Sequence, residues 1–292
     1  MAEGASPEAL YVAARRVILD GLEALGSHRQ AAILVGAHAV YLRVGQGDLA
    51  TTPATTDADL ALDPSRLGGV PLLDESLAAS GFVPKIGAGG PIIGTWVTEK
   101  EVAGSRVLVD LDLLVPEAVS GPGTRAARLG AQGDRLARKA PGLELALVDN
   151  SEMEVGALDA DPRSFTVRVA GAAALLVAKV HKVSDRLDDP RRDTYIAKDA
   201  LDILRLLRGT QDIALATVLA DARSGKTTSG DPALDSAIAG TVERALSLLG
   251  AEFGRESARG CALAGRAAVG RDDPSVVAAS LAALTSRLLE RL

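Results

Sequence analysis

Helical spacing of hydrophobic residues alternates with short, strand-like apolar runs along the first half of the chain. Large apolar side chains recur at helical spacing between Pro7 and Gly26, and Ser6 before Pro7 is a typical helix start. Short apolar runs at 31–35 and 57–62 instead predict buried strands. The further elements expected in this half are helices over 38–44 and 72–80 and strands over 95–98 and 106–115.

The second half of the chain changes character. Residues 120–142 combine Gly, Pro and scattered Arg with few large hydrophobes, which predicts a long loop containing a short helix. Strand-like runs follow at 143–148 and 165–169, and helical spacing then continues from Gly171 onward. The helices expected there are 172–187, 198–208, 213–223, 233–249 and two more before Leu292, with a linker at 225–231.

This order of elements predicts the fold class α/β (α+β). We expect a small mixed-sheet domain at residues 1–170, followed by an all-helical domain at residues 171–292. In such an arrangement the sheet carries polar functional side chains, and the helices complete a cleft beside it.

Carboxylates occupy strand positions where apolar residues are expected. Asp57 and Asp59 are two residues apart, so both point to one face of their strand, and Asp110 and Asp112 repeat this pattern. Burying these charges among Val and Leu is costly unless a cation compensates them, and a divalent cation is the simplest candidate. The pattern predicts a metal site. The alternative for either pair is a solvated strand edge.

A glycine turn precedes the first carboxylate pair. Gly36 ends the first expected strand, where it would let the backbone and the N-terminus of the next helix approach anionic oxygens. Thr55 and Thr56, directly before Asp57, are candidates to supply a hydroxyl there. A plain tight turn and ordinary loop threonines are the alternatives for these residues.

A lysine interrupts the apolar helix expected at 172–187. Lys179 follows a run of Ala, Leu and Val where a solvated lysine is unexpected, and Lys182 lies at i+3 on the same helical stripe. An ammonium group that reaches the β- and γ-phosphates of a nucleotide would explain Lys179. A lysine that snorkels from an amphipathic face is the alternative.

Together these motifs resemble those of the nucleotidyltransferase superfamily. Its pattern of a hydrophobic run, Gly-Gly/Ser, a spacer, Asp-x-Asp and a third carboxylate on a neighbouring strand is matched here with a long spacer and with Ala37 at the second small position. The Thr before Asp57 and the run Lys198-Asp199-Ala200-Leu201-Asp202 further resemble the AbiEii/AbiGii and MenT-type toxin branch. The resemblance covers roughly residues 30–210.

The resemblance implies a Mg²⁺-dependent enzyme that transfers a nucleoside monophosphate from an NTP to an acceptor hydroxyl. Asp57 and Asp59 would ligate two Mg²⁺ ions, which stabilise the attacking and leaving oxygens. The third carboxylate would be Asp112 or Asp110. We favour Asp112, because its run Asp-Leu-Leu is closer to the third-strand motif of the family.

The resemblance also implies contacts to the nucleotide and the acceptor. Asp199 would pair with Lys179 or orient the acceptor hydroxyl, whereas Asp202 could equally be a surface partner at helical spacing. The residues implied in binding the NTP are Gly36, Ala37, Thr55, Thr56, Lys179 and Lys182.

Composition and charge restrict the partners. Of the 292 residues, 47% are hydrophobic and 24% charged, which is ordinary globular usage. Aromatic residues make up only 2%, which disfavours a base-stacking platform, and a net charge of −6 is unlike a dedicated nucleic-acid binder. An RNA acceptor would need a local basic patch. The densest basic cluster is Arg125, Arg128, Arg135, Arg138 and Lys139, for which a solvated loop is the alternative.

Cellular location is inferred from what the sequence lacks. The single Cys261 cannot form an internal disulfide, in agreement with a reducing compartment. The first residues lack the pattern of a signal peptide, and no apolar stretch reaches membrane-spanning length. We therefore expect a soluble cytoplasmic protein with no membrane partner.

Three hypotheses for function remain after this step. The leading one, implied by the resemblance, is a toxin of a toxin-antitoxin pair that modifies the 3′ end of tRNA or another RNA and has a neutralising antitoxin as protein partner. A small-molecule nucleotidyltransferase of the aminoglycoside-modifying kind is the second, because an acidic protein suits a polycationic substrate. The third is a catalytically idle binding module of the same fold, with turnover lost through Ala37.

Overall fold

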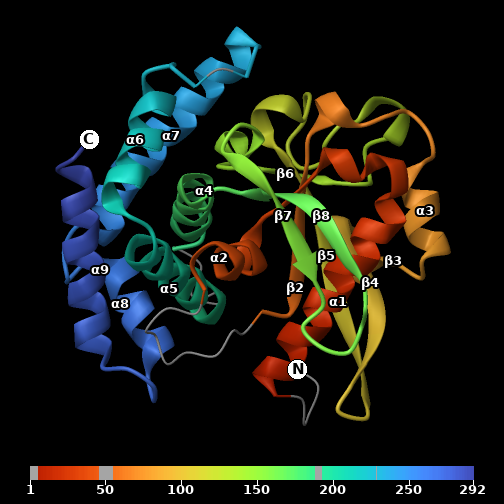
Figure 1. Ribbon diagram of the computed structural model, residues 1–292, viewed down its shortest axis with the longest axis horizontal. Coiled ribbons are helices and arrows are strands. Elements are labelled where there is room, and N and C mark those ends of the chain that lie inside the picture. The colour runs from red at the N-terminus through yellow and green to blue at the C-terminus, as the bar shows by residue number, and fades with distance from the viewer. Residues whose placement is uncertain (1–5, 46–54, 188–192, 228) are drawn as a thin grey trace. The chain divides into compact units, whose positions relative to one another are not determined.

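The computed structural model of the chain describes residues 6–45, 55–187, 193–227 and 229–292 (Figure 1). They form two compact units that are not continuous segments. One unit holds the described residues of Met1–His38, Thr52–Ala140 and Asn150–Val169, and the other holds those of Ala39–Thr51, Pro141–Asp149 and Ala170–Leu292. The mixed α/β class is confirmed. A domain boundary between residues 170 and 171 stays a prediction.

The first unit is built on one mixed sheet with the strand order β3-β4-β5-β2-β1-β8-β7, in which β6 also pairs with β5. The pairs β2–β5, β1–β8 and β5–β6 are parallel, and β1–β2, β3–β4 and β4–β5 are antiparallel. The strands are β1 (Ala32–Leu34), β2 (Asp57–Leu62), β3 (Val83–Gly87), β4 (Gly90–Val102), β5 (Ser105–Pro116), β6 (Arg138–Ala140), β7 (Asn150–Gly156) and β8 (Ser164–Ala170).

Helix α1 (Pro7–Leu25) covers one face of this sheet. It begins as expected, since the Ser6 side chain accepts a hydrogen bond from the backbone of Ala9 at 3.2 Å. The helix packs against β2, β4, β5 and the short α3 (Leu73–Ala79). A Cβ atom at Gly21 would lie 3.0 Å from Leu111 of β5, so helix and strand are in close contact. This covered face is the hydrophobic core of the unit.

The second unit is helical. Helix α4 packs against α5 and α7, α5 also packs against α8, and α8 packs against α9. The helices are α4 (Ala172–Ser184), α5 (Asp193–Gly209), α6 (Asp212–Arg223), α7 (Pro232–Phe253), α8 (Arg259–Ala268) and α9 (Pro274–Leu289). Among the helices that the structure describes, none is both long and apolar enough to cross a bilayer.

Several elements differ from the expectation. The strand expected at 143–148 is wrong: this run forms the 3₁₀ turn η5 (Glu144–Leu147), which packs against α4 and α7 with Leu145 and Ala146 buried. A short apolar run fits a buried turn as well as a strand, because its periodicity does not separate them. Strands β3, β6 and β7 were not expected, since β6 has three residues and the other two have mostly exposed or partly exposed side chains.

Candidate active site

Four aspartates form a block on one face of the sheet. Strands β2 and β5 run parallel in a register that pairs Asp57 with Asp110 and Asp59 with Asp112. The residues between them are buried on the opposite face, which α1 covers, whereas the four aspartates are only partly buried. The sequence predicted that each pair shares a face. The structure adds that both pairs lie side by side, and we call them the aspartate block.

Three polar side chains from neighbouring strands bind Asp110 and Asp112, the pair of the block that lies on β5. Lys85 of β3 donates a hydrogen bond to Asp110. Asp112 receives two bonds: Thr95 of β4 donates to its Oδ1 at 2.7 Å, and Arg138 of β6 donates to its Oδ2 at 2.6 Å. Sequence reasoning missed Lys85 and Thr95, because their positions depend on strand pairing that local patterns do not report.

The charges of the block influence one another. Partial burial raises the pKa of the Asp110 carboxyl, the hydrogen bond and charge of Lys85 oppose this rise, and the charges of Asp57 and Asp112 add to it. Partial burial by itself would lower the pKa of Lys85, but the contact with Asp110 outweighs it and the pKa is raised. The titration of Asp110 therefore depends on Lys85 and on the neighbouring carboxylates of the block.

The side chains of the block fit Mg²⁺ by their chemistry. They offer carboxylate oxygens, which are the ligands that Mg²⁺ prefers over the nitrogen and sulfur ligands of softer metals. In the described residues no group of three or more Asp, Glu, His or Cys side chains is arranged to hold a metal ion. Asp110 and Asp112 instead contact Lys85 and Arg138.

The glycine turn lies directly against the block. Gly36 has a φ of 70°, and a Cβ atom there would lie 2.1 Å from Oδ2 of Asp59, so only glycine fits this position. The backbone N–H of Val35 donates to the carbonyl of Asp59 at 3.2 Å. Helix α2 (Gly36–Val44) begins at this turn, with Ala37 partly exposed beside it. The expected phosphate turn and the first carboxylate pair are therefore neighbours.

The two threonines before β2 make local hydrogen bonds. Thr56 donates to Oδ1 of Asp57 at 3.0 Å, and the hydroxyl of Thr55 accepts from the backbone N–H of Asp57 at 3.3 Å. Both side chains thus fix the start of β2 and the orientation of its first carboxylate. A direct contact of either hydroxyl with a nucleotide stays a prediction.

A second group of charges lies in the helical unit, between α4 and α5. Lys179 places its Nζ 2.5 Å from Oδ1 of Asp199 and 2.8 Å from Oδ2 of Asp202. Lys182 lies 3.1 Å from Oδ2 of Asp199, and Arg205 lies 2.7 Å from Oδ1 of Asp202. We call these five residues the ion cluster. The expected pairing of Lys179 with Asp199 is present, and Asp202 is a buried partner rather than a surface one.

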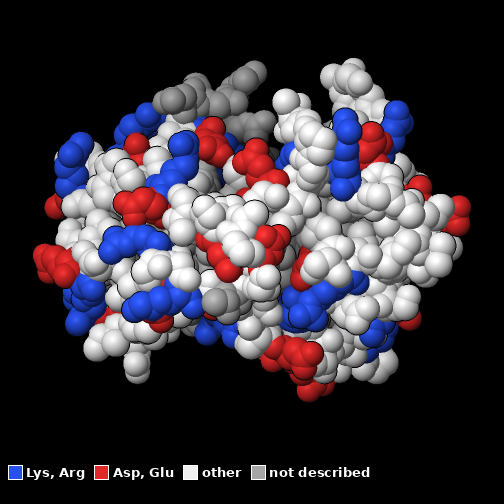
Figure 2. All heavy atoms as spheres, turned by 90° about the horizontal axis from the view of Figure 1, so that it is seen from above, with Lys and Arg blue, Asp and Glu red and all other residues white. Residues whose placement is uncertain are grey.

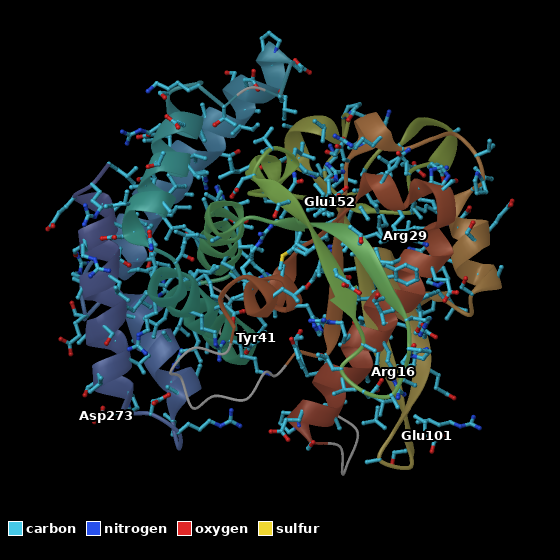
Figure 3. The ribbon with its side chains drawn as sticks, viewed as in Figure 1. Arg16, Arg29, Tyr41, Glu101, Glu152 and Asp273 are labelled. Atoms are coloured by element: carbon cyan, nitrogen blue, oxygen red, sulfur yellow. The ribbon has the colours of Figure 1, made fainter. Side chains whose placement is uncertain are left out.

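Because the ion cluster is buried, each of its charges strongly affects the pKa of its neighbours. Burial by itself would lower the pKa of Lys179, but the two carboxylates outweigh it and raise that pKa above its usual range. Burial would likewise raise the pKa of Asp199, but Lys179 and Lys182 hold it well below the usual value. The guanidinium of Arg205 also lies 5.0 Å from the centre of the ring of Tyr41, a residue of α2 that is labelled in Figure 3. Asp199 and Asp202 pair with the ammonium group of Lys179 inside the protein, so a contact of Lys179 with a triphosphate stays a prediction.

The basic cluster expected to bind RNA includes residues that are engaged within the protein and a residue that is exposed. Arg138 is engaged with Asp112, and the ammonium group of Lys139 donates to the carbonyl of Gly121. Arg135 is exposed. On the face drawn in Figure 2, basic side chains are interspersed with acidic ones. The basic cluster is therefore partly a structural neighbour of the aspartate block.

The histidines behave as packing residues. His38 is buried, stacks on Tyr11 with ring centroids 4.3 Å apart, and accepts a hydrogen bond from Arg15 at 3.3 Å. Burial lowers the pKa of His38 well below its usual value, with a smaller contribution from Arg15. A ring nitrogen of His181 lies 3.1 Å from the carbonyl of Thr241. Neither histidine contributes to the aspartate block.

Comparison with known proteins adds no relative. No family model matches the chain, and no curated protein matches it. The functional interpretation consequently depends on the arrangement of this chain's own residues.

Proposed function

We propose that the protein is a Mg²⁺-dependent nucleotidyltransferase that moves a nucleoside monophosphate from an NTP to the terminal hydroxyl of an RNA. The observation that carries this proposal is the register of β2 and β5, which aligns Asp57 with Asp110 and Asp59 with Asp112. The contact of the Gly36 turn with Asp59 supports it further, because the reaction needs a phosphate site and carboxylates side by side.

The reaction requires in-line displacement at the α-phosphorus of the NTP. The acceptor hydroxyl gives up its proton to solvent, its oxygen forms a bond to this phosphorus, the bond to the bridging oxygen breaks, and pyrophosphate leaves with that oxygen. When bound by Asp57, Asp59 and Asp112, two Mg²⁺ ions would neutralise charge on the attacking and leaving oxygens. Asp57 is already oriented by Thr56, and Asp112 by Thr95 and Arg138.

The remaining residues of the site have distinct roles in this proposal. Gly36 keeps the turn free of a side chain, so that phosphate oxygens can approach the first amides of α2. Lys85 holds Asp110 and reduces repulsion within the block. Of the two lysines that the resemblance implies in binding the NTP, Lys182 has the more exposed side chain, 39% against 5% for Lys179. Asp199 has the pairing role rather than that of orienting the acceptor.

Label transfer tests the proposed function. The protein is incubated with each labelled NTP and Mg²⁺ in the presence of total RNA, and separately with an aminoglycoside. We expect label on RNA, and its loss in Asp57→Asn and in Asp59→Asn with the fold retained, because Asn removes charge at nearly constant volume. Asp221→Asn, an exposed aspartate paired with Lys226 at 3.7 Å, is the matched control and should transfer normally.

The same experiment separates the alternatives. Label on the aminoglycoside alone would identify the small-molecule enzyme, and absence of label on both acceptors would identify the idle binding module. The toxin role and the antitoxin partner are implications of the resemblance, and the cytoplasmic location stays a prediction from the sequence. Induced expression in a bacterial host tests the toxin role: growth should stop with the natural sequence and continue with Asp59→Asn.

A further inference from the structure

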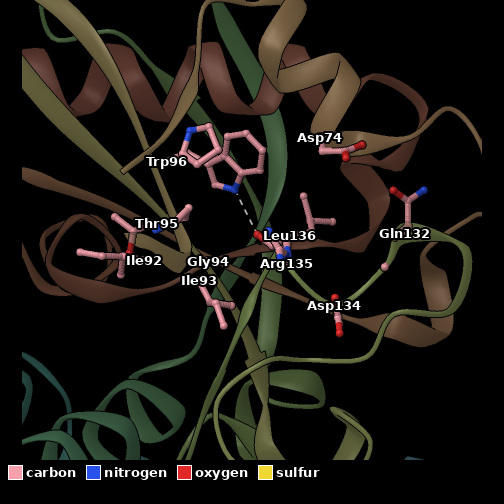
Figure 4. Close-up of a pocket in the computed structure, with 13 residues that line it drawn as sticks. Asp74, Ile92, Ile93, Gly94, Thr95, Trp96, Gln132, Asp134, Arg135 and Leu136 are labelled. Atoms are coloured by element: carbon pink, nitrogen blue, oxygen red, sulfur yellow. Dashed lines mark hydrogen bonds between the residues drawn. The ribbon is translucent and has the colours of Figure 1, made fainter. Parts of the chain in front are cut away.

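A pocket of about 460 Å³ opens beside the first residues of β4 (Figure 4). Its walls are mainly apolar, with Pro84 and Ile92 on the strand side and Leu136 on the loop side. Asp134 and Arg135 of the loop and Asp74 at the start of α3 supply its charged groups. Its volume is within the range of small-molecule sites.

The pocket results from the way in which two strands divide the edge of β5. Strand β4 pairs with β5 only from Thr95 onward, and β6 pairs with the following part of β5. Gly94 makes this separation possible, since it has a φ of 75° and a Cβ atom there would lie 2.4 Å from the backbone nitrogen of Arg138. The first residues of β4 therefore stay paired with β3 but diverge from β5, which leaves a hollow.

The walls of the pocket are fixed by hydrogen bonds of the protein itself. The indole N–H of Trp96 donates to the carbonyl of Leu136 at 3.0 Å. The amide of Gln132 donates to the carbonyls of Gly68 and Pro71 and accepts from the N–H of Leu73. These bonds join β4 and α3 to the loop, so the pocket is preformed and a ligand need not order it.

One side chain connects the pocket to the aspartate block. Thr95 lines the pocket and donates its hydroxyl hydrogen to Asp112. Along the sheet the pocket lies on the β4 side of the block, whereas the Gly36 turn follows β1 on the other side. In-line displacement needs the attacking hydroxyl opposite the leaving pyrophosphate. If the turn holds the leaving phosphates, the pocket is on the side of the acceptor.

We propose that this pocket binds the terminal base of the acceptor strand, and that it selects a base with an exocyclic amino group. The inference rests on the proposed function. Flat apolar walls suit the faces of a base, and the carboxylates of Asp74 and Asp134 accept hydrogen bonds from an amino group but not from the carbonyls of uracil. Arg135, also at the pocket, is placed to contact a phosphate of the same strand.

Binding without NTP and Mg²⁺ tests the pocket separately from catalysis. Short single-stranded RNA probes carry a 5′ fluorophore and differ only in a 3′-terminal A, C or U, and fluorescence anisotropy gives each dissociation constant. We expect probes ending in A or C to bind about fivefold more tightly than the probe ending in U, the effect of one net hydrogen bond.

Two variants and one matched control assign the preference to the pocket. Ile92→Trp should fill the cavity and remove the preference, and Asp134→Asn, at an exposed position that does not endanger folding, should reduce it. Ile86→Trp, on the neighbouring strand β3 and 70% exposed, is the control and should keep the preference. Circular dichroism of each variant verifies that it is folded.

Each outcome has a defined meaning. Equal affinity for all ends, absence of binding, a preference that survives both pocket variants, or displacement of the probes by an amino sugar at the same pocket would overturn the assignment. Transfer of label to RNA with no preference for the terminal base rejects the pocket and retains the proposed enzyme. A pocket-dependent preference without any label transfer rejects the enzyme and retains the pocket as a binding site.

Discussion

The aspartate block and the ion cluster are both groups of charges placed in apolar elements, but they differ in balance and exposure. In the block Asp110 pairs with Lys85 and Asp112 pairs with Arg138, and the side chains of these two aspartates are 20% and 17% exposed. The ion cluster combines two carboxylates with three cations, and Asp199 and Asp202 are 8% and 6% exposed.

Under the proposed function, this difference separates a functional group of charges, the block, from a structural one, the ion cluster. In the ion cluster each carboxylate oxygen named above already has a cationic partner inside the protein, so these ion pairs hold α4 against α5. In the block the side chains of Asp110 and Asp112 are more accessible, and under the proposed function its carboxylates would bind an external cation. The role of a charged residue in an apolar run can therefore be inferred only when the partners of its side chain are known.

The largest effect is expected from removing the central cation of the ion cluster. Lys179→Met leaves Asp199 and Asp202 buried with fewer partners, and we expect the free energy of unfolding to fall by about 3–5 kcal/mol. Urea denaturation measures this loss. Lys182→Met is the matched control, because its exposed contact is worth about 0.5 kcal/mol. Equal stability of the two variants would mean that the cluster is not structural.

The pH dependence of stability should have opposite signs in the two regions. The folded-state pKa of Asp199 is lowered, so its contribution is present above its unfolded value of about 3.9 and is lost as the pH falls further. The pKa of Asp110 is raised, chiefly by burial, so its contribution is present at low pH and is lost as the pH rises through the folded-state pKa.

Substitutions of Asp199 and Asp110 test the sign of the pH dependence of stability in each region. Urea midpoints measured across the acid range should decline less steeply for Asp199→Asn than for the natural sequence. The same measurement on Asp110→Asn should show a steeper relative loss at low pH, because this variant lacks the opposing contribution. Parallel curves for both variants would contradict the assigned pKa directions.

The contact between the glycine turn and the block can be tested with a pair of glycines. Gly36→Ala forces a Cβ atom onto Asp59 at a left-handed φ, and we expect a loss of stability of about 1–3 kcal/mol together with reduced label transfer. Gly26→Ala is the matched control: its φ of 51° is also left-handed, but its Cβ would meet nothing within 4 Å. Similar transfer rates in both variants would exclude a role for the contact.

The smallest effect is expected at the side chain that joins the block to the pocket. Thr95→Val removes the hydrogen bond to Asp112 and should cost about 1 kcal/mol in the barrier to transfer. Thr98→Val on the same strand is the control, since Thr98 is similarly buried but pairs in register with Val109. Initial rates of transfer at saturating NTP compare the two.

Local patterns predicted the parts of the site that depend on one strand or one helix. The alternation of Asp57 with Ala58 and the cap of α1 are of this kind, and both are present in the structure. The resemblance supplied the pairing of Lys179 with Asp199. The partners Lys85 and Arg138 were not predictable in this way, because they reach the block through strands whose register is set by distant parts of the chain.

The most direct measurement compares Asp59→Asn with Asp199→Asn for both label transfer and free energy of unfolding. We predict that Asp59→Asn abolishes transfer and leaves stability within about 1 kcal/mol of the natural sequence, since this carboxylate is partly exposed. Asp199→Asn should lose about 3 kcal/mol of stability and retain transfer per folded molecule. Normal transfer by Asp59→Asn, or loss of transfer without loss of stability in Asp199→Asn, would contradict the distinction between the two regions.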